Sequence, residues 1–139
     1  YAYQDPVALQ TGINDLFTLM RLGREEKRNF LTPDREEFFR VIASELAAEG
    51  LLNLYFLDIE GERVAACLCF DYDGQRLLYN SGFNPEHSQL SVGLLLKATC
   101  LEEAISGNLK YFDFLRGDEP YKYHLGGIDR KVYRMVVSR

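Results

Sequence analysis

The feature that most constrains the fold is an apolar run between two tight turns. Every residue from 64 to 70 is apolar, and the run lies between the turn-forming stretches 60–62 and 71–74. With apolar and aromatic runs at 52–59 and 76–83 on either side, this pattern predicts three antiparallel strands joined by short hairpins. A strand that is apolar at successive positions has no face suited to water. Helices are therefore expected on both faces of the sheet.

Two helices are predicted before these strands. Asp5 and Thr32 are each followed by proline, which places a capping side chain before a residue suited to the first helical position. Apolar residues at helical spacing follow in both cases, and Gly23 and Gly50 come just past the expected helix ends. The polar and charged stretch 21–31 between the two helices is predicted to be a connector.

A third helix and two further strands are expected after the antiparallel strands. Ser91 opens an apolar helix whose leucines are expected in the core, and Gly107 closes it. Residues 111–115 and 131–137 are typical of strands. The chain is thus predicted to form one α+β (α/β) domain over residues 1–139. Its sheet is expected to be mixed and mostly antiparallel, with helices on both faces.

Composition argues against several classes of function. The formal net charge is −5 and no run is rich in Lys or Arg, which disfavours a nucleic-acid partner. No apolar stretch is long enough to span a membrane and no signal peptide is evident, so a cytoplasmic protein without membrane insertion is expected.

Cys67, Cys69 and Cys100 lack Cys-x-x-Cys spacing and are expected to be buried, reduced thiols. His87 and His124 lie far apart, so no metal site is predicted.

The densest group of titratable side chains lies between positions 116 and 124, directly after a predicted strand. Such a group at a strand end is typical of sites of chemistry in α/β proteins. The first candidates for catalysis are Asp118, Glu119, Tyr121 and Lys122, and the second are Tyr123 and His124. In the alternative interpretation, Arg116 and Lys122 are ion-pair partners of the acids and hold the loop closed.

The start of the third helix is a candidate anion site. The free N–H groups and the positive dipole end of a helix N-terminus suit a phosphate or pyrophosphate. Gly93 would permit close approach of the backbone to such a ligand. Ser91 is either a ligand contact or a plain capping hydroxyl.

Three stretches, 79–85, 90–95 and 113–123, together with the order of elements, resemble a GNAT-fold acyltransferase. More narrowly, the chain is similar to the GNAT-like domain of the cellulose-biosynthesis-type, BioF2-like acetyltransferases, which are relatives of the Fem aminoacyltransferases. Proteins of this family often carry two tandem GNAT-like halves, and the chain is similar to the C-terminal one. The resemblance therefore implies a fragment of a longer protein, with an N-terminal GNAT-like half as a partner.

The resemblance also implies acetyl-CoA as the acyl donor, lying between two splayed strands with its pyrophosphate at the start of the third helix. The donor-binding residues that it implies are Asn80, Gly82, Phe83, Ser91, Val92, Gly93 and Leu94. GNAT enzymes generally carry an Arg/Gln-x-x-Gly-x-Gly/Ala loop at this point. This sequence keeps Gly93 but has Leu90 and Leu95 at the other two places. The departure weakens the expectation of coenzyme A binding, although not that of the fold.

In the mechanism that the resemblance implies, backbone N–H groups of residues 80–83 polarise the thioester carbonyl. Tyr121 or Tyr123 protonates the leaving thiolate, and Asp118 or Glu119 recognises or deprotonates the amine. The leading hypothesis is an N-acyltransferase that acts on an amine of a sugar, an amino acid or an envelope or polysaccharide precursor, with a small-molecule acceptor. One alternative is a catalytically silent GNAT-like half that shapes an acceptor or interaction site. The other is a Fem-type aminoacyl transferase, which the net acidity disfavours because its donor is a charged tRNA.

Overall fold

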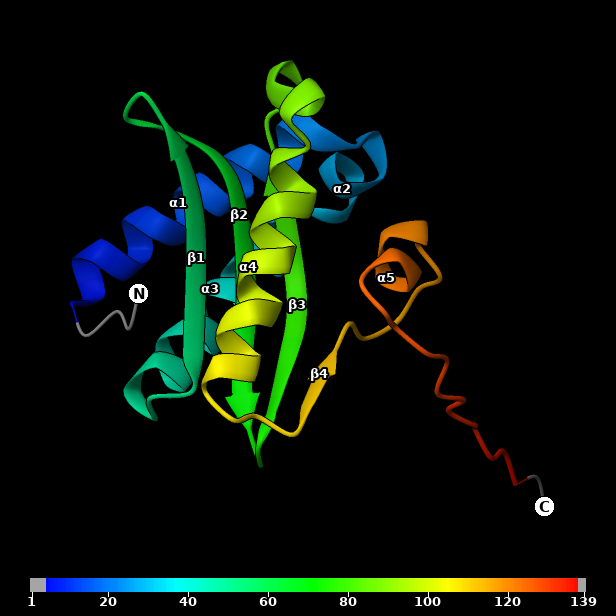
Figure 1. Ribbon diagram of the computed structural model, residues 1–139. Coiled ribbons are helices and arrows are strands. Elements are labelled where there is room, and N and C mark those ends of the chain that lie inside the picture. Colours follow the sequence, from blue (N-terminus) through cyan, green and yellow to red (C-terminus); the bar gives the residue numbers. More distant parts are fainter. Residues whose placement is uncertain (1–4, 138–139) are drawn as a thin grey trace.

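The computed structural model describes residues 5–137 and joins four strands into one sheet in the order β1-β2-β3-β4. Strands β1 (Leu52–Ile59), β2 (Glu62–Tyr72) and β3 (Gln75–Phe83) form the predicted antiparallel arrangement. The short strand β4 (Tyr111–Asp113) pairs in parallel with residues 75–77 of β3 (Figure 1). The mixed, mostly antiparallel sheet is therefore confirmed.

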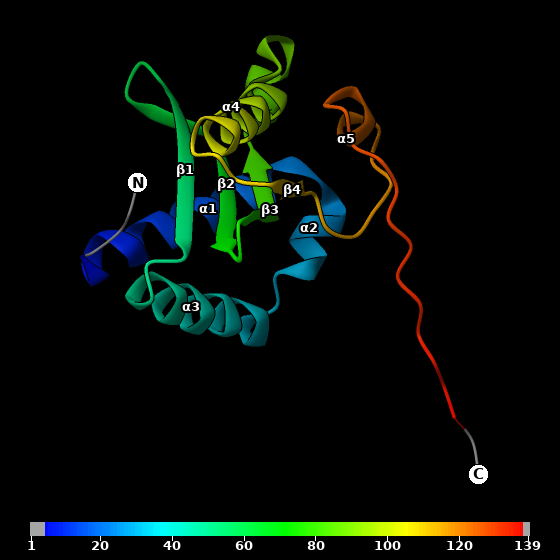
Figure 2. The ribbon, with the colours of Figure 1, turned by 60° about the horizontal axis from the view of Figure 1, so that its bottom comes forward.

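Strand β2 is covered on both faces, as its apolar run predicted. Its residues Ala66 and Leu68 pack in one core cluster with helices α1 (Pro6–Gly23) and α3 (Pro33–Ala48). The alternate residues Cys67 and Cys69 pack in a second cluster with helix α4 (Val92–Ser106). Figure 2 shows α4 on one side of the sheet and α1 and α3 on the other. The sheet is thus the middle layer between two layers of helix.

The capping signals of the first two predicted helices are confirmed. Asp5 Oδ1 accepts a hydrogen bond from the Val7 N–H at 3.0 Å, and the Thr32 hydroxyl accepts one from the Arg35 N–H at 3.4 Å. Both satisfy backbone donors that have no partner within the first helical turn. After α3, Gly50 adopts φ 70° and lets the chain turn into β1.

The prediction that residues 21–31 form a connector is wrong. Helix α1 continues to Gly23, and a second helix, α2 (Glu25–Phe30), follows directly. Acidic residues in the first turn of α2 and basic residues in its last turn favour the helix through its dipole. Leu31, just past its end, is buried and ties the segment to the core cluster of α1 and α3.

The predicted strand 131–137 is also wrong. These residues form neither helix nor strand, and the side chains of Val132 and Val136 are 91% and 74% exposed. An apolar run of this kind has strand propensity, but a strand also needs a neighbour for its backbone hydrogen bonds. The preceding strand is shorter than the predicted 111–115 and ends at Asp113, whose side chain accepts a hydrogen bond from the Leu115 N–H at 2.7 Å.

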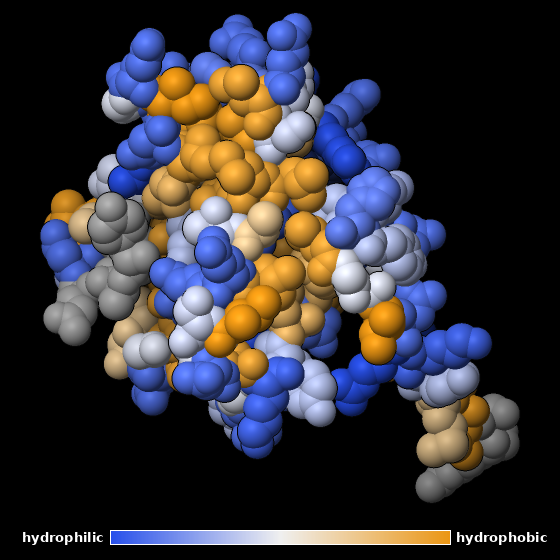
Figure 3. Space-filling view, viewed as in Figure 1, coloured by the Kyte–Doolittle hydropathy of each residue, from blue (hydrophilic) through white to orange (hydrophobic). Residues whose placement is uncertain are grey.

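The leucines of α4 are only in part core residues. Leu96 is 4% exposed, whereas Leu94 and Leu95 are 39% and 53% exposed. Figure 3 shows apolar residues gathered on the face of the molecule that carries α4. The leucines therefore lie on both buried and exposed sides of α4.

The remaining described elements are the 3-10 helix η1 (Pro85–Leu90) and the short helix α5 (Pro120–His124). The three cysteines are free and buried, as predicted. Within residues 5–137, no helix has the length and apolar character needed to cross a membrane. In the same residues, no group of three His, Cys, Asp or Glu side chains is placed to hold a metal ion.

Helix α1 packs so closely on β3 that Gly82 has no room for a side chain. A Cβ there would lie 2.4 Å from the Met20 nitrogen and 2.6 Å from the Leu19 carbonyl carbon. Gly82→Ala should therefore lower the free energy of unfolding, measured by urea denaturation, by about 2 kcal/mol or more. Gly23→Ala is the matched control because its Cβ would meet only the Phe83 carbonyl oxygen, at 3.6 Å. Equal stability of the two variants would contradict this packing argument.

Candidate functional site

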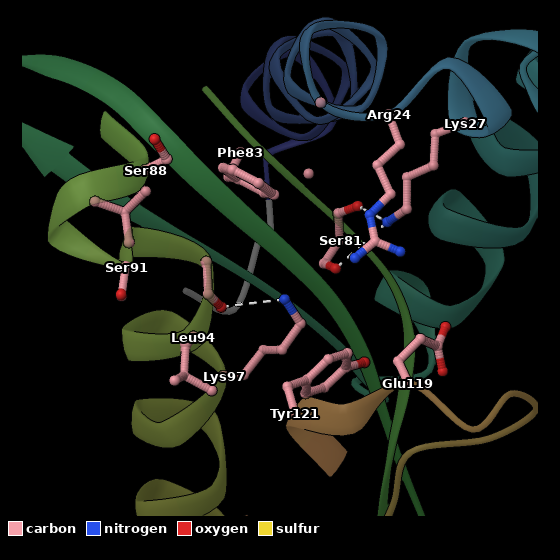
Figure 4. A pocket seen from close by; sticks show the side chains of 14 residues that line it. Arg24, Lys27, Ser81, Phe83, Ser88, Ser91, Leu94, Lys97, Glu119 and Tyr121 are labelled. Carbon is pink, nitrogen blue, oxygen red and sulfur yellow. Dashed lines mark hydrogen bonds between the residues drawn. The ribbon is translucent and has the colours of Figure 1, made fainter. Parts of the chain in front are cut away.

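A cavity of about 260 Å³ lies where strands β3 and β4 separate. Their parallel pairing ends at Leu77 and Asp113, so residues 78–83 of β3 have no strand on the side away from β2. Helix α2, the start of α4 and helix α5 surround this free edge (Figure 4). The lining residues are Gly23, Arg24, Lys27, Ser81, Gly82, Phe83, Ser88, Ser91, Val92, Gly93, Leu94, Lys97, Glu119 and Tyr121.

The start of α4 presents unpaired backbone donors to this cavity. Ser91 adopts φ 51°, and its carbonyl oxygen accepts hydrogen bonds from the N–H groups of Leu94 and Leu95, both at 2.9 Å. The N–H groups of Val92 and Gly93 then have no acceptor within the helix. The Ser91 side chain makes no capping hydrogen bond, so its interpretation as a plain capping hydroxyl is wrong. Donors of this kind at a helix N-terminus can bind an anion.

Lys27 reaches from α2 to the free edge of β3. Its ammonium donates hydrogen bonds to the Ser81 carbonyl oxygen and, at 3.2 Å, to Asn80 Oδ1. Asn80 Oδ1 also accepts from the Ser81 N–H at 2.9 Å, which takes up one of the donors expected to polarise a thioester. Burial, followed by the charges of Lys97 and Arg24, lowers the pKa of Lys27 to about 8. The cavity is thus a positively charged environment.

Lys97 and Tyr121 face each other across the cavity. Lys97 is 8% exposed, and its Nζ donates to the Gly93 carbonyl oxygen at 3.1 Å. The same atom lies 4.8 Å from the centre of the Tyr121 ring, a cation–π contact. Burial, and then the charge of Glu119, raises the pKa of Tyr121 to about 12. The phenol therefore keeps its proton at neutral pH and can serve as a proton donor.

Glu119 borders the cavity through a loop that Lys122 holds together. Lys122 Nζ lies 3.4, 2.7 and 3.1 Å from the carbonyl oxygens of Leu115, Arg116 and Gly117, and 2.8 Å from Glu119 Oε2. Burial acts to raise the pKa of Glu119, but Lys122 outweighs it and lowers the pKa below its ordinary value. Glu119 is thus a carboxylate at neutral pH. The arrangement agrees with the alternative interpretation for Lys122, whereas Arg116, its other predicted cation, makes no ion pair with a described residue.

The other predicted catalytic residues lie outside the cavity lining. Asp118 and His124 are exposed. Tyr123 is also exposed, and its hydroxyl donates to Asp129 Oδ1 at 2.8 Å, which raises the pKa of Tyr123. The tyrosine that faces the cavity is therefore Tyr121.

The predicted donor-binding residues come together at the cavity. All of them line it except Asn80, which positions Lys27 through the contact described above. The lining residues that the sequence argument missed are Gly23, Arg24, Lys27, Ser88 and Lys97. Arg24 and Lys27 were not predicted as site residues because their segment was expected to be a connector. Lys97 could have been predicted from the sequence, because it lies one helical turn after Gly93 and therefore on the same side of the helix.

Comparison with protein families identifies one family. Residues 4–123 match the family described as "Acetyltransferase (GNAT) domain". No curated protein matches the sequence significantly.

Solved structures share the fold. AAC(6')-Iy in complex with the bisubstrate analogue CoA-S-monomethyl-acetylneamine is 14% identical with a TM-score of 0.63, over 94% of this chain and 93% of that one. The ribosomal-protein-S18-alanine N-acetyltransferase from Escherichia coli is 14% identical with a TM-score of 0.62, over 84% and 68%. A GCN5-related N-acetyltransferase from Kribbella flavida is 20% identical with a TM-score of 0.63, over 84% and 31%.

The contacts of Lys122 predict a structural role. Lys122→Met would leave the loop carbonyls and the Glu119 carboxylate without their cation, which is costly for partly buried groups. We expect the amides of residues 115–127 to exchange hydrogen at least about tenfold faster, measured by mass spectrometry, with the sheet unchanged. Tyr123→Phe is the control, because it removes only an exposed hydroxyl contact. Loss of acyl transfer with unchanged exchange in Lys122→Met would instead favour a catalytic role.

Proposed function

The chain belongs to the GNAT acetyltransferase family, and from this premise we propose that it transfers an acetyl group from acetyl-CoA to an amine of a small molecule. One observation carries the proposal. The cavity at the free edge of β3 brings the anion-binding start of α4 together with an ionised carboxylate, Glu119, and a protonated phenol, Tyr121. Acyl transfer from a thioester to an amine needs an anchor for the donor, a proton acceptor and a proton donor.

The start of α4 is the proposed anchor for the donor. The N–H groups of Val92 and Gly93 and the helix dipole favour the pyrophosphate, and the nearby Lys97 adds a positive charge. Gly93 also makes room for the Phe83 ring, because a Cβ would lie 3.2 Å from Phe83 Cδ1. Substitution of Gly93 would therefore disturb the packing as well as the ligand, so another residue is needed to test this anchor.

Glu119 and Tyr121 are proposed to move the protons. Glu119 accepts a proton from the attacking amine, directly or through a water molecule. The amine nitrogen loses this proton as it forms its bond to the acyl carbon, and the carbon–sulfur bond then breaks. Tyr121, whose phenol is protonated at neutral pH, donates its proton to the leaving thiolate. The products are an amide and free coenzyme A, and passage of the proton from Glu119 to the Tyr121 phenolate, directly or through water, restores both groups.

The narrower resemblance to the cellulose-biosynthesis-type, BioF2-like acetyltransferases supports an acceptor among sugars, amino acids or envelope precursors. A second candidate function is a catalytically silent GNAT-like module that shapes an acceptor site. It is favoured by Leu90 and Leu95, which replace the polar and small residues of the usual phosphate loop. Binding of coenzyme A separates the two candidates.

A charge placed at the start of α4 tests the anchor. Leu94→Asp introduces a carboxylate into the cavity lining, and a carboxylate in the first turn also favours the helix. We expect unchanged thermal stability but coenzyme A binding at least about tenfold weaker by calorimetry, a loss of about 1.4 kcal/mol. Leu95→Asp is the matched control, because Leu95 is in the same turn but outside the lining. We expect it to weaken binding by less than about threefold.

The outcomes of this titration are distinct. Equal weakening by the two carboxylates would contradict the placement of the pyrophosphate at this cavity. No binding of acetyl-CoA or coenzyme A to the unmodified protein would exclude the proposed enzyme and favour the silent module.

A further inference from the structure

The positive charges of the cavity are divided between two sides of strand β3. Arg24, the residue between α1 and α2, and Lys27 of α2 lie on the side of the helices that form the first core cluster. Lys97 comes from α4, on the opposite face of the sheet. Figure 4 shows Arg24 and Lys27 on one side of Ser81, and Lys97 on the other. The division matters because the proposed donor anchor uses only the α4 side.

The Arg24 guanidinium has no partner within residues 5–137. It makes no side-chain hydrogen bond or ion pair with any described residue, although it lines the cavity (Figure 4). In contrast, six arginines between residues 21 and 76 donate a hydrogen bond from the side chain to a side-chain or backbone oxygen: Arg21, Arg28, Arg35, Arg40, Arg63 and Arg76. Arg24 is exposed, and a guanidinium that lines a cavity without an acceptor is available to a planar anion such as a carboxylate or a phosphate.

Lys27 adds a second positive charge at the same place. Its ammonium is held against the Ser81 carbonyl and the Asn80 side chain, so it does not need to be reoriented when a ligand arrives. The only acidic lining residue is Glu119, and Lys122 lies 2.8 Å from its carboxylate. The cavity is therefore positive in a chain whose formal net charge is −5. A bound anion would relieve the repulsion between Lys27, Arg24 and Lys97.

We propose that the amine acceptor carries an anionic group, a carboxylate or a phosphate, which Arg24 and Lys27 bind on the α2 side of β3. This inference rests on the proposed acyl transfer. The acceptor would place its anion toward α2 and its amine toward Glu119 and Tyr121, which line the same cavity. A polycationic acceptor, such as the aminoglycoside sisomicin that is bound in one similar structure, is disfavoured because its ammonium groups would meet those of the protein.

The test separates the acceptor side from the donor side. The protein is first saturated with coenzyme A, which occupies the α4 side. It is then titrated with inorganic phosphate and, in a second arm, with glycine as a carboxylate bearing an amine. We expect both to bind, and we expect Arg24→Gln to weaken this binding at least about tenfold while coenzyme A affinity changes less than about threefold.

Arg28→Gln is the matched control. It removes the same charge from a nearby residue of α2 that is also exposed but lies outside the cavity lining, and whose guanidinium donates to the Arg21 carbonyl oxygen. We expect it to leave both affinities within about twofold of the unmodified protein. Arg24→Gln is not expected to unfold the protein, because the side chain has no partner in the described structure to lose.

Four results would overturn the inference: no binding of either probe to the coenzyme A complex, equal weakening by both variants, unchanged probe binding in Arg24→Gln, or loss of coenzyme A affinity in Arg24→Gln. The last result would assign Arg24 to the donor.

Failure of the proposed function looks different, since the unmodified protein would then not bind coenzyme A. A stronger effect in the phosphate arm than in the glycine arm would identify a phosphorylated acceptor, and the reverse would identify a carboxylate.

Discussion

The free outer edge of strand β3 is the constraint on which the site depends. Strand β4 pairs only with residues 75–77 and the chain then turns away, so the end of β3 keeps an edge that no strand covers. Polar backbone groups on such an edge need other partners. The Ser81 carbonyl accepts from Lys27, and the Ser81 N–H donates to the Asn80 side chain. One short pairing thus explains both the opening and the positive charge beside it.

Signals of helix ends and strand turns predicted most of the fold. Helices α1 and α3 begin at capping side chains followed by proline, and the three antiparallel strands are separated by turn residues. Helix α2 escaped prediction because it has only six residues, and contacts such as that of Lys27 with β3 fix it in place. Residues 131–137 have a strand-like sequence but no pairing partner. Local sequence pattern was therefore insufficient to predict secondary structure where contacts with distant residues determine it.

The sequence identified the charged segment after β4 as a candidate site, but it could not show which of its residues face the cavity. Neighbouring side chains on a helix point about 100° apart, so only some can face a given cavity. Within α5, Tyr121 faces Lys97, whereas Lys122 is buried among loop carbonyls and Tyr123 points toward Asp129. Which residue faces the cavity depends on how α5 docks, and that is a tertiary property.

In the proposed arrangement, the fold and the class of acceptor depend on different parts of this chain. The fold is shared with structures that are 14–20% identical, and the start of α4 is the proposed donor anchor. Arg24 and Lys27 lie in a different part of the chain, in the short helix α2 and at its N-cap. Acceptor preference can therefore diverge among proteins that keep the same donor site. On this proposal, the charged residues that face the cavity from positions 24 and 27 are a better guide to the acceptor than similarity of the fold.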